Sequence, residues 1–124
     1  MQEKAPLSGK RVLVAEDEAL IATDYAAMLS AAGAEIVGTP RSGADVIRHL
    51  QKGKVDAAIV DFVLADGNSR ALQAHLTEKR VPFVVISGYP SVLVRESNNQ
   101  RVLHKPVKPD ELCAAVLALC GGEP

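Results

Sequence analysis

The sequence predicts an α/β fold in which a parallel β-sheet lies between two layers of helices. Short runs of aliphatic residues alternate along the chain with longer segments whose apolar residues recur at helical spacing. The short runs are apolar almost throughout, which is typical of strands that are covered on both faces. Strands that alternate with helices are joined by right-handed crossovers, and the strands of such a sheet are parallel.

The first two strand–helix units lie in the first half of the chain. The run RVLVA at 11–15 predicts a buried strand, and a helix is expected over 18–32. A short edge strand is expected at 35–37, and Ser42 then caps a helix that ends at Gly53. The first helix has a buried stripe at helical spacing, formed by Ile21, Tyr25, Met28, Leu29 and Ala32.

The third unit begins with the run AAIV at 57–60, which predicts a second buried strand. This strand delivers Asp61 at its C-terminal end. The residues Ala-Asp-Gly-Asn at 65–68 predict a turn, and a helix is expected to follow over about 69–79.

The last two units are less regular. The run FVVI at 83–86 predicts a third apolar strand, whereas 91–100 is polar and weakly periodic and predicts a short or mobile helix. A brief strand is expected at 101–103. The final helix has Pro109 in its first turn, where a missing N–H costs nothing, and it ends at Gly121.

The composition restricts the class of protein. The 124 residues are a common length for one domain, so we expect a single domain over 1–124 with its core at about 11–120. A net charge of −1 provides no basic excess for binding nucleic acid. No apolar run approaches the ~20 residues of a membrane span, and no signal-peptide stretch begins the chain, so a cytoplasmic protein is expected. Cys113 and Cys120 lie roughly 10 Å apart along a helix, too far for a disulfide.

Polar residues follow the predicted strands at the same relative point. Glu16 and Asp17 come directly after the first strand, and Asp61 comes after the third. Ser87 follows the fourth strand, and the fifth strand runs into Lys105. Functional groups in parallel sheets gather outside the C-terminal strand ends. We therefore expect three carboxylates, one hydroxyl and one ammonium to converge at one edge of the sheet.

The charges of this group predict a metal-dependent phosphoryl site. Two carboxylates about 4 Å apart repel each other by about 4 kcal/mol at an effective dielectric constant of ~20. The cluster therefore needs a cation or raised pKa values, and Mg²⁺ is the hard divalent ion that suits a reducing interior. A phosphoryl group would complete the metal shell and meet Lys105. Asp61 can act as the nucleophile, while Ser87 and Lys105 would each bind a phosphoryl oxygen.

The same residues resemble those of the receiver domain of response regulators in two-component signalling. The pattern consists of Glu16-Asp17, the segment VDFVLADG at 60–67 that contains Asp61, then Ser87, and then Lys105-Pro106. The resemblance extends over about 11–120. It implies a flavodoxin-like (βα)5 sandwich whose five-stranded parallel sheet has the order 2-1-3-4-5.

The resemblance also implies a function. A histidine kinase or a histidine phosphotransfer protein would transfer a phosphoryl group to Asp61 with Mg²⁺, and this would switch the binding of a downstream protein partner. Asp17, Asp61 and the backbone carbonyl of Val63 would ligate the metal, and Glu16 would act largely through water. The chain would be a signalling switch with self-phosphorylation and self-dephosphorylation chemistry, not an enzyme.

Two positions depart from the pattern of the family. Glu16 stands where the family often has Asp, and a Glu there is compatible with metal binding. Val102 stands three residues before Lys105, where the family usually carries its switch aromatic. Tyr89, two residues after Ser87, is a candidate to replace that aromatic.

Other functions compete with that of a signalling switch. The chain is alternatively a receiver-like module that binds proteins without cycling phosphate, or the receiver fragment of a larger regulator or hybrid kinase. A phosphatase with an Asp nucleophile would need a second Asp at the position of Val63, which cannot move a proton. A flavin carrier is disfavoured because the acidic loop 16–18 would repel the flavin phosphate.

Overall fold

A computed structural model describes residues 5–88 and 102–121 of the chain. Its main feature is one five-stranded parallel sheet with the strand order β2-β1-β3-β6-β7. The prediction of a flavodoxin-like sheet with the order 2-1-3-4-5 is confirmed, since β6 and β7 are the fourth and fifth strands of this sheet. The strands are β1 (Arg11–Ala15), β2 (Glu35–Gly38), β3 (Ala57–Asp61), β6 (Phe83–Ser87) and β7 (Val102–His104).

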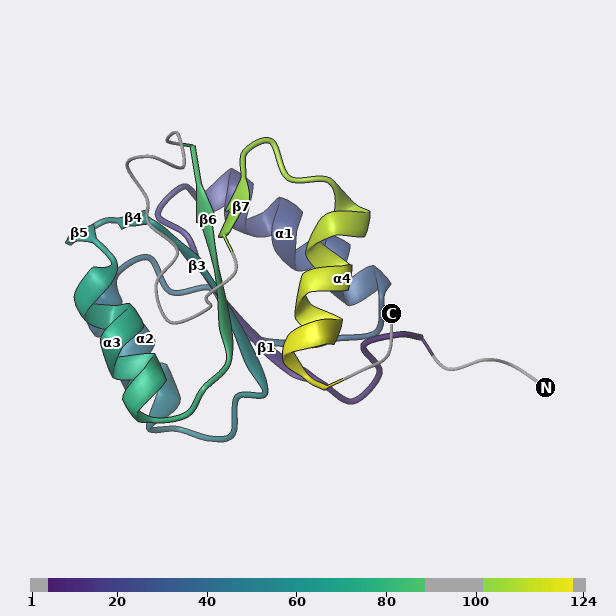
Figure 1. The fold of residues 1–124 in the computed structure, drawn as a ribbon, viewed down its shortest axis with the longest axis horizontal. Helices are drawn as coiled ribbons and strands as arrows, with labels where there is room; N and C mark the ends of the chain where they lie inside the picture. The colour runs from purple at the N-terminus through teal and green to yellow at the C-terminus, as the bar shows by residue number, and fades with distance from the viewer. Residues whose placement is uncertain (1–4, 89–101, 122–124) are drawn as a thin grey trace.

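Helices cover both faces of the sheet, as Figure 1 shows. One layer contains α1 and α4, and the other contains α2 and α3. The helix expected at 91–100 lies outside the described residues, and so does Tyr89. In the part of the chain that the structure describes, no helix is both long and apolar enough to span a membrane. The bounds of the helices are α1 (Ala19–Ala31), α2 (Gly43–Leu50), α3 (Arg70–Glu78) and α4 (Pro109–Leu119).

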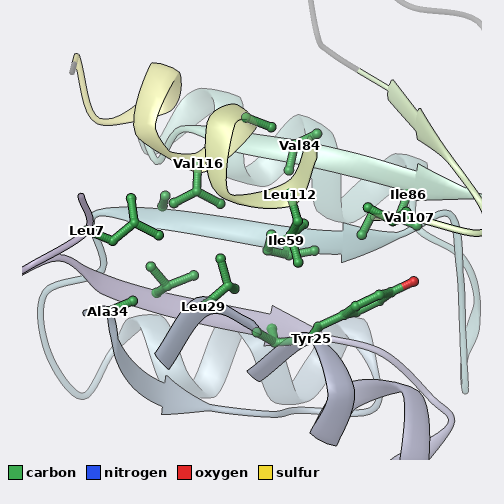
Figure 2. Packing of buried hydrophobic residues seen from close by; sticks show 14 of the residues in the cluster. Leu7, Tyr25, Leu29, Ala34, Ile59, Val84, Ile86, Val107, Leu112 and Val116 are labelled. Atoms are coloured by element: carbon green, nitrogen blue, oxygen red, sulfur yellow. The ribbon is translucent and has the colours of Figure 1, made fainter. Parts of the chain in front are cut away.

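The sheet separates two hydrophobic clusters because successive side chains of a strand point to opposite faces. On β1, for example, Val12 and Val14 belong to the cluster under α1 and α4, whereas Leu13 belongs to the cluster under α2 and α3. Figure 2 shows the first cluster, to which the sheet and the layer of α1 and α4 contribute. Its labelled members include Leu29 of α1, Ile59 of β3, Val84 of β6, and Leu112 and Val116 of α4.

A small antiparallel hairpin follows β3. It consists of β4 (Val63–Leu64) and β5 (Gly67–Asn68), with Val63 paired to Asn68 and Leu64 to Gly67. The sequence predicted only a turn at this point. Gly67 has a φ of +116°, which side-chain-bearing residues rarely adopt, and this allows the tight return of the chain.

The packed core begins earlier than the range of 11–120 expected from the sequence. Leu7 is completely buried in the cluster under α1 and α4. Its N–H donates a hydrogen bond to the Ala32 carbonyl at 2.8 Å, and the Lys10 carbonyl accepts one from the Glu35 N–H, also at 2.8 Å. The residues before β1 are therefore part of the folded structure.

Gly33, at the end of α1, is the point at which this N-terminal segment packs, and its replacement by alanine should be costly. Its φ is +100°, and an added Cβ would lie 2.7 Å from the Ala5 Cβ and 3.1 Å from the Ser8 nitrogen. We expect Gly33→Ala to lower the free energy of unfolding by about 1–3 kcal/mol, measured by urea denaturation. Gly53→Ala is the control, because its Cβ would meet only Arg11 Nη2 at 3.6 Å. Equal stability of the two variants would contradict this account.

Candidate functional site

The parallel sheet brings the predicted site residues to one edge. Asp61 is the last residue of β3, and Ser87 is the last residue of β6. Glu16 directly follows β1, and Lys105 directly follows β7. These four strands are neighbours in the order β1-β3-β6-β7, with Asp61 level with Ile86 and Ser87 level with His104. Their C-terminal ends therefore lie side by side, as the sequence predicted.

Lys105 makes a short contact with Asp61. Its Nζ donates a hydrogen bond to Asp61 Oδ2 at 2.7 Å and lies 3.9 Å from Glu16 Oε2. Partial burial works against the ammonium, but the hydrogen bond to Asp61 and the charges of Asp61 and Glu16 outweigh it and raise the pKa of Lys105. The Lys105 N–H donates to the Ser87 carbonyl at 2.9 Å, and the Lys105–Pro106 peptide is cis. The ammonium is thus held between two acidic groups.

Glu16 is completely buried, which is unusual for a carboxyl group. The Glu18 N–H donates to its Oε1 at 3.4 Å, but no described residue donates a hydrogen bond to its Oε2. Burial, with a further contribution from hydrogen bonding and charge repulsion by Asp61, raises the pKa of Glu16 to about 8. Without a metal ion, Glu16 is therefore mostly protonated at neutral pH, and Asp61 is the closer of the two acidic partners of Lys105.

Both carboxylate oxygens of Asp61 are engaged. Oδ2 accepts from Lys105, and Oδ1 accepts from the Val63 N–H at 3.2 Å. The Asp61 residue is only 5% exposed, so its carboxylate is largely buried beside Lys105. The chain beyond it is fixed by a 2.7 Å hydrogen bond from the Ser69 N–H to the Phe62 carbonyl. Ser87, the other predicted phosphoryl ligand, is fully buried at the end of β6.

The acidic residues fit a divalent cation. Carboxylate oxygens of Glu16, Asp17 and Glu18 lie within 4.8 Å of one another. Oxygen ligands of this kind are those that Mg²⁺ prefers, and the Glu16 oxygen that receives no hydrogen bond from described residues is a group that a cation or its water would satisfy. Glu18 was not expected in this cluster, and Asp61 is not one of its three members.

The loop between β2 and α2 is hydrogen-bonded to the residues that follow β1 and to the β4–β5 hairpin. The Pro40 carbonyl accepts from the Glu16 N–H at 3.1 Å, and Arg41 Nε donates to the Asp17 carbonyl at 3.0 Å. The Arg41 carbonyl in turn accepts from the Ala65 N–H at 2.9 Å. Sequence reasoning did not find Arg41, because nothing in the local pattern distinguishes it from an ordinary surface arginine.

The two switch positions differ in what the structure describes. Val102 is buried in the cluster under α2 and α3, and Tyr89 lies outside the described residues. Tyr25 is another aromatic residue near the site, and the sequence assigned it only to the core. Its ring is buried, and Figure 2 shows its hydroxyl pointing in the direction in which the strands run. Burial raises the Tyr25 pKa, and the charges of Lys105, Glu16 and Asp61 also act on it, so α1 borders the acidic site.

Comparison with known proteins identifies the family. The family model for the response regulator receiver domain matches residues 12–117. The transcriptional regulatory protein PdtaR of Mycobacterium tuberculosis is 31% identical over 112 residues, which cover 86% of this chain and 55% of PdtaR. The crystal structure of the response regulator PhyR from Brucella abortus has 26% identity and a TM-score of 0.79, over 95% of this chain and 51% of that one.

A second structural relative is similar in length. The solution structure of SdrG from Sphingomonas melonis Fr1 has 31% identity and a TM-score of 0.74, over 92% of this chain and 97% of SdrG. By contrast, the chain spans about half the length of the curated relatives that it matches. The match to the family model covers most of the chain and overlaps every strand of the main sheet. The chain belongs to the family of response regulator receiver domains of two-component systems.

Proposed function

We propose that the chain accepts a phosphoryl group on Asp61 in a Mg²⁺-dependent reaction and thereby switches its binding to a downstream protein. The observation that carries this proposal is the contact of Lys105 with Asp61 at 2.7 Å, beside the buried Glu16. An ammonium that is paired with an aspartate can transfer its hydrogen bond to a phosphoryl oxygen once the aspartate is phosphorylated, because that oxygen then carries the negative charge.

Asp17, Asp61 and the Val63 carbonyl are proposed to hold Mg²⁺, and Glu16 is proposed to act through water. When bound, the ion would shield the negative charge of the incoming phosphoryl group and of the nucleophile. Glu16 would lose its proton on metal binding, because the cation stabilises the ionised carboxylate. The cluster of Glu16, Asp17 and Glu18 oxygens supports an acidic metal site here.

The transfer itself needs little from the protein beyond positioning. An Asp61 carboxylate oxygen attacks phosphorus, an O–P bond forms, and the bond from phosphorus to the donor breaks. With a phosphohistidine donor the imidazole nitrogen takes up the bond electrons, and with acetyl phosphate the acetate oxygen does so. Lys105 would then move its hydrogen bond from Asp61 to a phosphoryl oxygen, and the Ser87 hydroxyl would donate to another.

A histidine kinase or a histidine phosphotransfer protein is the proposed donor, and we propose that the readout is protein binding. Among the residues that the structure describes, Leu20 is the exposed large hydrophobic side chain, at 83%, and it lies on α1 close to Glu18. It offers a contact for the donor beside the acceptor site. A PhyR from Bartonella quintana, 26% identical to this chain, is called an anti-anti-sigma factor, a name that supports a protein as the downstream partner.

The test is incubation with acetyl phosphate and Mg²⁺, followed by intact-mass measurement. We expect the mass of one added phosphoryl group, which EDTA should prevent. Absence of the added mass from a folded protein would favour the alternative, in which the chain binds a partner without cycling phosphate. Continuous release of phosphate from a small phosphoester would instead favour an enzyme.

Replacement of Lys105 should separate metal binding from phosphorylation. Lys105→Ala removes the cation that occupies Asp61 in the metal-free protein, so Mg²⁺ should bind more tightly, by about three- to tenfold. Phosphorylation by acetyl phosphate should nevertheless become at least about tenfold slower, because a phosphoryl oxygen loses its ion pair. Calorimetry and a time course of intact mass measure the two effects.

The control for this variant is Lys79→Ala, which makes the same change of charge at an exposed residue next to α3. It should alter neither the Mg²⁺ affinity nor the phosphorylation rate by more than about twofold. If Lys105→Ala bound Mg²⁺ more weakly than Lys79→Ala, the idea that the ammonium and the metal compete for Asp61 would be wrong.

A further inference from the structure

We propose that Asp66 is a positioning residue, which clamps the β4–β5 hairpin to the start of α2 and thereby fixes Val63 opposite the acidic loop. This inference rests on the proposed function, because Val63 is assigned there to the metal through its carbonyl. Asp66 lies in the turn of the hairpin, and Val63 lies in its first strand.

The clamp consists of two hydrogen bonds between segments far apart in the sequence. Asp66 Oδ1 accepts from the Gly43 N–H at 2.9 Å, and Asp66 Oδ2 accepts from the Ala44 N–H at 3.3 Å. These N–H groups belong to the first turn of α2, where they have no partner within the helix and where the helix dipole favours a negative charge. The hydrogen bond from Gly43 is the main reason that the pKa of Asp66 is lowered, so the carboxylate stays ionised in neutral solution.

The helix does not depend on Asp66 for its N-cap. Ser42 already occupies that position, and its Oγ accepts from the Asp45 N–H at 3.1 Å. Asp66 therefore does something that a local cap does not, since it joins α2 to a hairpin that follows the phosphoacceptor strand. The hairpin has two residues in each strand, and its residues 65–68 are exposed. A hairpin of this size needs an anchor to keep one conformation.

The same β2–α2 loop is also bonded to the other side of the site. Its Pro40 carbonyl accepts a hydrogen bond from the Glu16 N–H, and its Arg41 side chain donates one to the Asp17 carbonyl. The hairpin is bonded to the same segment: Asp66 accepts hydrogen bonds from the first turn of α2, and the Arg41 carbonyl of the loop accepts one from the hairpin. The spacing between Val63 and Asp17 is thus set through one short segment, and loss of Asp66 should loosen it.

The experiment compares Asp66→Ala with Ser42→Ala. Each variant removes a side-chain acceptor from the first turn of α2, so both should lose a similar amount of stability in urea denaturation. Asp66→Ala should weaken Mg²⁺ binding by about tenfold, as is common when a group that orients a metal ligand is removed. Ser42→Ala should bind Mg²⁺ as wild type does, and Asp66→Asn, which keeps one acceptor oxygen, should recover part of the affinity. Calorimetric titration with MgCl₂ measures all four proteins.

Hydrogen exchange provides a second readout that a loss of stability alone would not change. Coupling between two sites is reciprocal, so Mg²⁺ should slow amide exchange at Gly43 and Ala44 if Asp66 connects them to the metal. Slower exchange is expected in wild type and in Ser42→Ala, and no change is expected in Asp66→Ala. Equal Mg²⁺ affinity of Asp66→Ala and Ser42→Ala would overturn the positioning role while phosphorylation of wild type still supports the proposed function. Failure of wild type to bind Mg²⁺ would overturn both.

Discussion

Asp61→Asn is expected to abolish uptake of a phosphoryl group from acetyl phosphate. The substitution keeps the size of the side chain, but an amide is not a nucleophile toward phosphorus and cannot form the acyl phosphate. Intact-mass measurement after incubation with Mg²⁺ should show no added phosphoryl group, even after many half-times of the wild-type reaction. Asp24→Asn, on the exposed side of α1, is the matched control and should react as wild type does. Modification of Asp61→Asn would mean that another residue is the acceptor.

The stability of Asp61→Asn tests the electrostatic account separately. Loss of the Asp61 charge removes two of the causes that raise the Glu16 pKa, so Glu16 should ionise more readily and take over as the partner of Lys105. We expect the metal-free variant to lie within about 1 kcal/mol of wild type in urea denaturation at neutral pH. A loss of several kcal/mol would show that Glu16 does not compensate.

Rising pH is expected to destabilise the metal-free fold and to strengthen Mg²⁺ binding over the same interval. Burial raises the pKa of Glu16 from its ordinary value of 4.5 to about 8 in the folded protein. The folded state therefore retains a proton that the unfolded state has lost, and the stability from this group is present below the lower pKa and disappears as pH rises through the higher one. The metal requires the ionised form, so its affinity should increase by up to about tenfold per pH unit below the folded-state pKa.

Glu16→Gln isolates this effect, since an amide resembles the protonated carboxyl but does not titrate. At about pH 8.5 the metal-free variant should be more stable than wild type by roughly 4 kcal/mol, and at about pH 5 the difference should vanish. Its Mg²⁺ affinity should be lower than that of wild type and independent of pH. Glu78→Gln, on exposed surface of α3, should follow wild type at each pH. A difference between Glu16→Gln and wild type that does not change with pH would contradict the raised pKa.

The strands of the main sheet and the helices α1 to α4 were predictable because each follows from a local pattern. The apolar runs at 57–60 and 83–86 became β3 and β6 with one further residue each, Asp61 and Ser87. These two added residues are functional candidates, and because their side chains are polar, the sequence placed the end of each strand one residue too early. The resemblance to receiver domains implied the strand order, and the meeting of Asp61 with Lys105 followed because parallel strands place their C-terminal ends along one edge.

Other features depend on contacts that no local pattern encodes. The turn at 65–68 was recognisable from Asp66 and Gly67, but the hydrogen bonds from Asp66 to α2 depend on how two distant segments meet. The burial of Glu16 was equally hidden, since an acidic residue after a strand is usually a solvated cap. Repulsion among the carboxylates was foreseeable, but the burial that raises the pKa of Glu16 depends on the packing of the site.

The buried Leu7 has a practical consequence for anyone who excises this module. The match to the family model starts at residue 12, inside β1, and a fragment designed on that boundary would lack Leu7 and the segment that crosses Gly33. Such a fragment would keep every acidic residue of the site, but it would expose apolar surface at the opposite end of the sheet, where chains could aggregate. Fusion proteins and crystallisation fragments should therefore start upstream of Leu7, so that a failure of solubility is not mistaken for a failure of signalling.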